Sequence, residues 1–115
     1  MQYLLLIYGR EAEMLAASEE TTRQTIAAYE VYVEAMKRAG VLVGSNRLRP
    51  TASARTVRGS NGKATVVDGP FAETKEQLGG YFLIDVPDLD AAQSWAARCP
   101  AVARGSVEVR PVWVM

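Results

Sequence analysis

Two segments of this chain place bulky apolar side chains on both faces of an extended strand. Residues 2–8 (QYLLLIY) and residues 81–84 (YFLI) are apolar or aromatic at nearly every position. Because successive side chains of a strand point to opposite faces, such segments are typical of strands that are covered on both sides. The fold must therefore cover two faces of a sheet.

Two helices are predicted between the strands. The first begins after Ser18, a good N-cap residue, and ends near Gly40, where a left-handed C-terminal cap is expected. The second starts at Asp88 and ends before Pro100. The expected core-facing residues are Ile26, Tyr29, Val33 and Met36 in the first helix and Leu89, Ala92, Ala96 and Cys99 in the second.

Further strands are predicted over residues 41–48, 54–58, 64–67, 81–86 and 106–114. The Gly-Ser-Asn-Gly sequence at 59–62 separates two of them, and Asn-Gly between β-rich segments is a strong hairpin signal. The order is β-α-β, an inserted hairpin, then β-α-β. It predicts a single α+β domain over residues 1–115, a ferredoxin-like split βαβ sandwich with an inserted hairpin.

Two helices can cover only one face of such a sheet. An exposed apolar face larger than a few hundred Å² is unusual on a monomer. We therefore expect a homodimer in which the second faces of two sheets pack against each other.

Composition excludes several classes of chemistry. There is no histidine and one cysteine, Cys99, so Ser-His and Cys-His nucleophile systems, an intramolecular disulfide and a thiolate zinc cluster are excluded. The same lack of histidine and of paired cysteines means that no metal site is expected. No cofactor is expected either, since Gly79-Gly80 lacks a phosphate-binding motif. Thirteen basic and thirteen acidic residues cancel, which disfavours nucleic acid as a partner. The longest apolar run near the start is too short for a signal peptide or a membrane span, so we expect a cytoplasmic protein.

Residues 68–86 (DGPFAETKEQLGGYFLIDV) resemble the DGPF-type branch of the YCII-related family. The resemblance continues at residues 3–9, 39–42, 48–50, 92–98 and 105–112. It implies a dimeric α+β barrel with a pocket in each subunit beside the sheet. A histidine–aspartate pair is suggested as catalytic in some relatives, and at least one relative is regarded as a dehalogenating enzyme. This chain has no histidine, so the paired mechanism does not carry over.

The turn after the second hairpin strand holds the candidate acid or base. Asp68 is expected either to cap backbone amides of the turn or, desolvated by Phe71, to act as a general acid or base. Glu73 and Glu76 are expected on the solvated face of a short helical turn, and Lys75 is expected to pair with them.

A cationic stretch precedes this turn, with no acidic residue between Glu34 and Asp68. Arg47 and Arg49 are two residues apart and share a face of a strand, so they could recognise a carboxylate or phosphate. The alternative is a solvated hairpin whose charges protect sheet edges from aggregation. The basic residues of this stretch are Lys37, Arg38, Arg47, Arg49, Arg55, Arg58 and Lys63.

The preferred hypothesis is a homodimer that binds a small organic molecule, with an anionic group favoured by the arginines, near the DGPF turn. The expected ligand-binding residues are Tyr8, Arg47, Phe71, Glu73 and Lys75. The alternative is a cofactor-free lyase, isomerase or dehalogenase-like enzyme with Asp68 as general acid or base. A nucleic-acid-binding or regulatory module is a weaker alternative, because no aromatic residue interleaves the basic stretch.

Overall fold

The computed structural model describes residues 1–115 as six strands, three α-helices and two short 3-10 helices. The strands are β1 (Gln2–Gly9), β2 (Leu42–Arg47), β3 (Arg55–Ser60), β4 (Lys63–Asp68), β5 (Gln77–Asp85) and β6 (Ser106–Pro111). The helices are α1 (Glu11–Ala16), α2 (Glu19–Arg38) and α3 (Leu89–Arg98), with 3-10 helices at Thr51–Ser53 and Pro100–Ala103. None of the helices is long and apolar enough to cross a membrane.

Four strands form one sheet in the order β2-β5-β1-β6, with every neighbouring pair antiparallel. Strands β1 and β2 both run antiparallel to β5, which lies between them, so α2 links two parallel strands across an intervening one. Helix α3 links β5 to β6 across β1 in the same way. This is the split βαβ arrangement that the sequence predicts.

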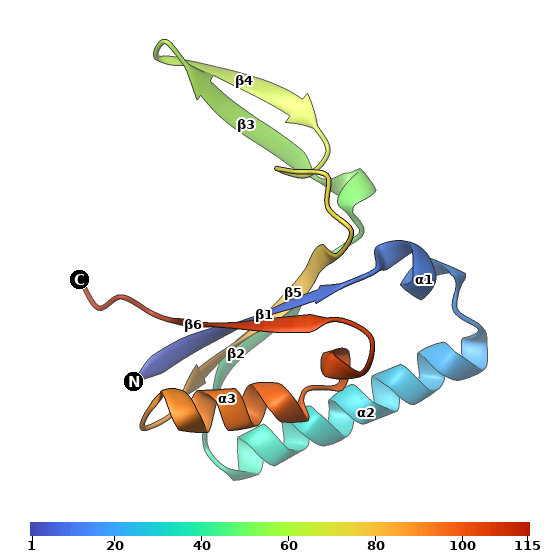
Figure 1. Cartoon of the computed structure of the whole chain (residues 1–115), viewed down its shortest axis with the longest axis vertical. Coiled ribbons are helices and arrows are strands. Elements are labelled where there is room, and N and C mark those ends of the chain that lie inside the picture. The colour runs from blue at the N-terminus through green and yellow to red at the C-terminus, as the bar shows by residue number, and fades with distance from the viewer.

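Helices α2 and α3 lie on the same side of this sheet, which Figure 1 shows nearly edge-on. The core forms between them. Side chains of β1 and β5 pack there against Tyr32 and Met36 of α2, and the Tyr32 hydroxyl donates a hydrogen bond to the carbonyl of Trp95 at 2.7 Å. The buried core comprises Tyr3, Leu5, Tyr32, Met36, Phe82, Ile84, Val86, Ala92, Ala96 and Cys99.

The helix termini follow the sequence signals. The Ser18 side chain accepts a hydrogen bond from the amide of Thr21, and the Asp88 side chain accepts one from the amide of Ala91. Gly40 has a φ of 71°, so the left-handed cap is confirmed. Ile26 and Leu89 are exposed, contrary to prediction, because the core contacts of α2 begin at Tyr29 and those of α3 at Ala91.

Several elements differ from the sequence predictions. The connection after β1 contains a short helix, α1, and no helical turn forms at Glu73–Glu76. Strand β6 ends at Pro111 and not at Val114. Strand β5 begins at Gln77 and not at Tyr81, because the glycines lie inside the sheet. A Cβ at Gly80 would come within 2.8 Å of the Asn46 carbonyl oxygen, so close backbone approach requires glycine there.

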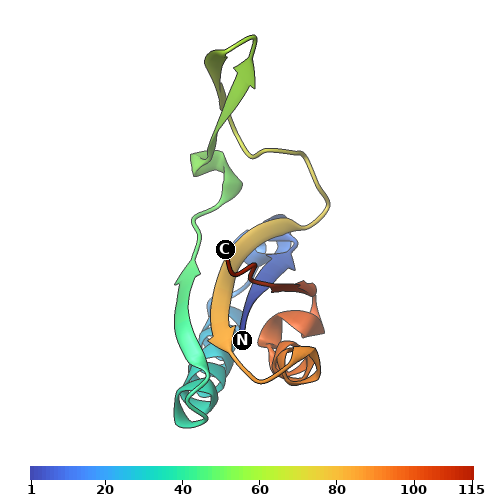
Figure 2. The ribbon, with the colours of Figure 1, turned by 90° about the vertical axis from the view of Figure 1, so that its left-hand side faces the viewer.

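Strands β3 and β4 form a separate two-stranded sheet, called here the hairpin arm (residues 55–68). Its turn is Asn61-Gly62, with both φ angles positive, as Asn-Gly predicts. The arm extends from the domain on the side of the sheet opposite α2 and α3 (Figures 1 and 2). The radius of gyration is accordingly 16.0 Å, against about 13 Å for a compact chain of this length.

We expect Met36→Ala to lower the free energy of unfolding by about 2–5 kcal/mol, since Met36 is fully buried and truncation leaves a cavity. The matched substitution Val31→Ala lies on the same helix, where Val31 is 72% exposed. It should change stability by less than about 0.5 kcal/mol. Urea denaturation followed by circular dichroism measures both, and equal losses would contradict this assignment of the core.

Candidate functional site

The face of the sheet opposite the helices is apolar across its two central strands. The register places Leu4 beside Leu83, Leu6 beside Tyr81, and Tyr8 beside Leu78. Leu4, Leu6, Tyr8, Tyr81 and Leu83 alternate with the core residues of β1 and β5, so their side chains point away from α2 and α3. A register shift between Ile7 and Tyr8 brings Leu78 opposite Tyr8. No element of the chain covers this surface, which is called here the open face (Leu4, Leu6, Tyr8, Leu78, Tyr81 and Leu83).

Polar groups lie along the margins of the open face. The side-chain amide of Asn46 in β2 donates a hydrogen bond to the Tyr81 hydroxyl at 2.7 Å. At the end of the sheet nearest the arm, the Ser106 hydroxyl donates to the Glu76 carboxylate at 2.8 Å. Tyr8 is paired with Ser106 in the register, so a phenol, a hydroxyl and a carboxylate gather at this end of the sheet.

Arg47 lies at the same end of the sheet but on the other face. It is in register with Gly80, which pairs with Ile7, and Ile7 packs against the core under the helices. A guanidinium nitrogen of Arg47 lies 3.7 Å from the sulfur of Met14 in α1. Within one chain the structure therefore does not bring Arg47 and Tyr8 into one pocket.

Asp68 closes the arm at its base. Its carboxylate pairs with the Arg55 guanidinium at 3.0 Å and is 87% exposed. It accepts no backbone amide, so of the two roles considered for it the capping role is not observed. The amide of the next residue, Gly69, donates to the carbonyl of Ala54 at 2.9 Å and ties the turn to the start of β3.

Phe71 packs against Arg58 and does not cover Asp68. The Arg58 guanidinium lies over the ring at 5.2 Å from its centre and donates to the Phe71 carbonyl at 2.9 Å. The other edge of the ring is open, and Phe71 as a whole is 76% exposed. An exposed aromatic ring beside an arginine is a surface suited to stacking against a planar ligand or a partner.

Glu73 and Lys75 are exposed in the loop that joins the arm to β5. The predicted ion pairs of Lys75 with its neighbouring glutamates are not present. The loop is instead stabilised by a hydrogen bond within it, since the side chain of Gln77 donates to the backbone carbonyl of Thr74 at 2.7 Å. Glu73 and Lys75 are thus free to meet a ligand from solution.

Glu11 anchors the base of the arm and was not identified from the sequence. Its carboxylate accepts hydrogen bonds from the amide and the hydroxyl of Thr51, both at 2.6 Å. Its own amide donates to the side-chain oxygen of Gln77 at 2.9 Å. One residue therefore holds both chain segments that lead into and out of the arm. A sequence pattern gives no signal for contacts between residues so far apart in the chain.

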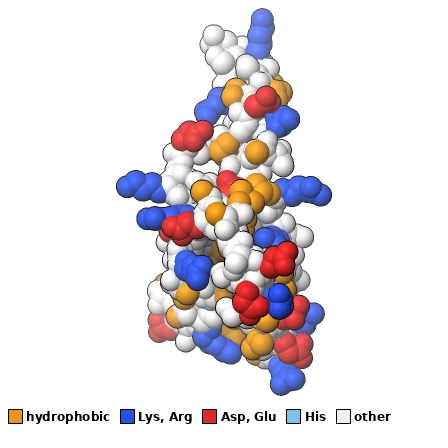
Figure 3. Space-filling model, turned by 90° about the vertical axis from the view of Figure 1, so that its right-hand side faces the viewer, with side chains coloured by type: hydrophobic (Ala, Val, Ile, Leu, Met, Phe, Trp, Pro, Cys, Tyr) orange, Lys and Arg blue, Asp and Glu red, His pale blue; other side chains and the backbone are white.

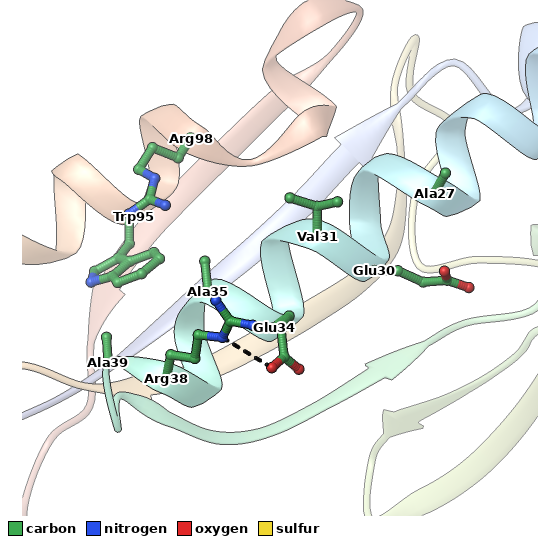
Figure 4. A pocket seen from close by; sticks show the side chains of 9 residues that line it. All are labelled: Ala27, Glu30, Val31, Glu34, Ala35, Arg38, Ala39, Trp95 and Arg98. Atoms are coloured by element: carbon green, nitrogen blue, oxygen red, sulfur yellow. Dashed lines mark hydrogen bonds and ion pairs between the residues drawn. The ribbon is translucent and has the colours of Figure 1, made fainter.

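A shallow groove lies between α2 and α3, far from these residues (Figure 4). Val31 and Ala35 line it on α2, and Trp95 lines it on α3 with the Arg98 guanidinium stacked over its ring at 4.3 Å. Glu34 and Arg38 form an ion pair on its α2 side. Of the basic stretch identified in the sequence, the groove is lined by Arg38 alone, and that residue is paired with Glu34.

Three titratable groups cluster in the core: Tyr29, Tyr32 and Cys99. Burial is the largest cause that raises the pKa of each phenol well above its usual value, and the nearby Cys99 raises both further. Burial also raises the pKa of the Cys99 thiol. Cys99 is 1% exposed and is the small buried apolar residue that the sequence predicts, not a reactive thiolate.

The strand order defines a ferredoxin-like α+β domain with one covered and one uncovered sheet face. A family model, the YCII-related domain, matches residues 1–115, and the chain belongs to this family. It is 43% identical over 118 residues to an uncharacterised protein of Rhizobium meliloti (strain 1021), a match that covers 97% of this chain and 92% of the relative.

A solved structure with a similar fold is 5-chloro-2-hydroxyhydroquinone dehydrochlorinase (TftG) from Burkholderia phenoliruptrix AC1100, in complex with 2,5-dihydroxybenzoquinone. The TM-score is 0.57, and the match covers 98% of this chain and 94% of that chain. The two sequences are 14% identical, so the likeness shows the fold alone.

We expect stability to fall as the pH rises above about 10, the ordinary pKa of tyrosine. The folded protein then retains phenolic protons that the unfolded chain releases, because burial raises the pKa of Tyr29 and Tyr32. The double variant Tyr29→Phe, Tyr32→Phe removes both groups and should show a shallower decline, measured by urea denaturation between pH 8 and 11. An unchanged slope would contradict the assignment.

Proposed function

We propose that the protein is a homodimer that binds a small organic molecule beside the turn at Asp68–Phe71. In this dimer the open faces of two sheets pack against each other and complete an α+β barrel. The observation that carries the proposal is the row of apolar side chains on the open face, which nothing in the chain covers. Burying such side chains contributes about 25 cal/mol per Å², and sheets pack face to face at about 10 Å.

The ligand site is proposed at the end of the sheet from which the arm leaves. Tyr8 supplies a phenol there, Phe71 supplies an exposed ring, and Glu73 and Lys75 lie on the adjoining loop. Lys75, and not Arg47 on the other face of the sheet, supplies positive charge that favours an anionic group. The Asp-Gly-Pro-Phe sequence of the turn supports placing the chain in the DGPF-type branch of its family. A cytoplasmic setting is supported by the single unpaired cysteine.

Replacement of Leu83 by glutamate tests the dimer. Leu83 lies in the middle of the open face, between Leu4 on one side and Gly44 on the other, so Leu83→Glu buries a charge in the proposed interface. Val31→Glu places the same charge on the exposed side of α2 as a control. By sedimentation equilibrium at micromolar concentration, we expect the wild type and the control to be dimers and Leu83→Glu to be a monomer. A wild type of 12.5 kDa would refute the proposed dimer.

A second candidate function is catalysis without a cofactor, and the fold likeness to a dehydrochlorinase favours it over other enzyme classes. In this version Asp68 takes or donates a proton while an arginine stabilises developing negative charge. Loss of HCl from a chlorinated hydroxyhydroquinone is the reaction to test first, and lyase or isomerase chemistry on the same carbon framework is the alternative. Since Asp68 is exposed in its own chain, this role needs cover from the second subunit.

The substitution Asp68→Asn separates catalysis from binding. If the protein is a dehydrochlorinase, the wild type releases chloride from 5-chloro-2-hydroxyhydroquinone, and Asp68→Asn lowers this rate by about 10²-fold or more. Calorimetry with 2,5-dihydroxybenzoquinone should give the same affinity for both proteins. Retention of the full rate by the variant would remove Asp68 from the mechanism. Binding of the quinone with no chloride release by the wild type would leave only the binding function.

A further inference from the structure

The hairpin arm has no packing partner within its own chain. Strands β3 and β4 pair with each other and with no strand of the main sheet, and every residue of β4 is exposed. A two-stranded hairpin alone is marginally stable in water and needs a further strand, a helix or another surface against its apolar face. Within a single chain, the apolar face of the arm therefore has no surface to pack against.

One face of the arm is apolar beyond the Arg55–Asp68 ion pair at its base. The register pairs Val57 with Val66 and Gly59 with Ala64, and these four residues point to the same side. The two valines are 63% and 64% exposed. The opposite, polar face carries Arg58 beside Thr65, and its one apolar side chain is Val67, which pairs with Thr56 at the base. Figure 3 shows hydrophobic side chains exposed along the arm and at its base, between charged groups.

The arm stands on the same side of the sheet as the open face. Figure 1 shows it rising from the start of β5 and leaning back above the sheet, with α2 and α3 on the far side. Its six-residue strands are about 20 Å long at about 3.3 Å per residue, twice the spacing of about 10 Å between packed sheets. The arm therefore reaches past a second sheet packed on the open face, and such a sheet would lie alongside the arm.

The base of the arm is held in this position. The Glu11 carboxylate accepts a hydrogen bond from Thr51, which precedes β3. The amide of Gly69, which follows β4, donates to the carbonyl of Ala54, which precedes β3. The turn that follows is fixed to the arm as well, because Arg58 holds the Phe71 carbonyl. Val57, Val66 and Asp68 lie on one face of the arm, whereas Arg58, with the Phe71 ring beneath it, lies on the other face.

We propose that the arm of each subunit embraces the other subunit of the homodimer, packing its Val57–Val66 face against the partner. The inference rests on the proposed homodimer. A second copy is the occupant that covers both apolar surfaces on this side of the molecule at once, because two-fold symmetry buries two open faces and two arms together. The arms extend the contact beyond the six side chains of the open face, toward the roughly 1,200–2,000 Å² that stable interfaces bury.

A consequence concerns the ligand site. Asp68 lies on the same face of the arm as Val57 and Val66, so in the proposed dimer it lies against the partner and the site contains residues of both subunits. The exposure of the Asp68 carboxylate in a single chain is then the exposure of an incomplete site.

Matched substitutions on the two faces of the arm test this proposal. Val66→Asp puts a carboxylate on the apolar face, and Thr65→Asp puts the same group on the polar face one residue away. Sedimentation equilibrium should show that Val66→Asp raises the dimer dissociation constant by about ten-fold or more, whereas Thr65→Asp changes it by less than about two-fold. Hydrogen exchange should show the amides of residues 55–68 protected in the wild type and unprotected in the monomeric Leu83→Glu variant.

The outcomes separate the arm from the sheet. If Val66→Asp dimerises as tightly as the wild type while Leu83→Glu is a monomer, the embrace is refuted and the sheet-to-sheet dimer stands. If the wild type itself is monomeric, both proposals fall. Arm amides that exchange equally fast in the wild-type dimer and in the Leu83→Glu monomer would also refute the embrace.

Discussion

The pairing of β1 with β5 determines the rest of the structure, because both strands are apolar on both faces. One face supplies Leu5 and Ile84 to the core beneath α2 and α3, where both are fully buried. The same alternation necessarily places Leu4, Leu6 and Leu83 on the opposite face. Two helices on one side of such a sheet leave the apolar side chains of its other face unburied. One face of the sheet builds the core of the domain, and we propose that a second subunit covers the other face.

The arm and the DGPF turn also carry side chains that a single chain leaves exposed. Asp68 and Phe71 are held in place by Arg55 and Arg58, yet both remain open to solvent in a single chain. Ordered but uncovered side chains on a projecting hairpin are typical of surfaces that meet another molecule. We therefore propose that the pocket lies at the contact between two subunits and not in a cavity of one.

Much of the fold could be predicted from signals between residues that are close in the sequence. The caps at Ser18 and Asp88 and the Asn61-Gly62 turn depend on side chains a few residues apart, and each appears where the sequence predicts it. The strand order followed from the order of the elements. Helix α1 and the first four residues of β5 were missed, because a six-residue helix has little periodicity and because glycine pairs usually interrupt strands.

The candidate site was less accessible from the sequence. Its residue types were identified, but their positions depend on contacts over long separations, such as Glu11 with Thr51, and on which face of the sheet each residue occupies. Tyr8 and Arg47 illustrate the difficulty, since both lie at one end of the sheet and the register sends them to opposite faces. The partner surface is a property of two chains, and one sequence describes only one of them.

Light scattering on the unmodified protein, coupled to size-exclusion chromatography at micromolar concentration, tests the central claim most directly. Two subunits with packed open faces predict a mass of twice 12.5 kDa. A single species of 12.5 kDa across that concentration range would contradict the account.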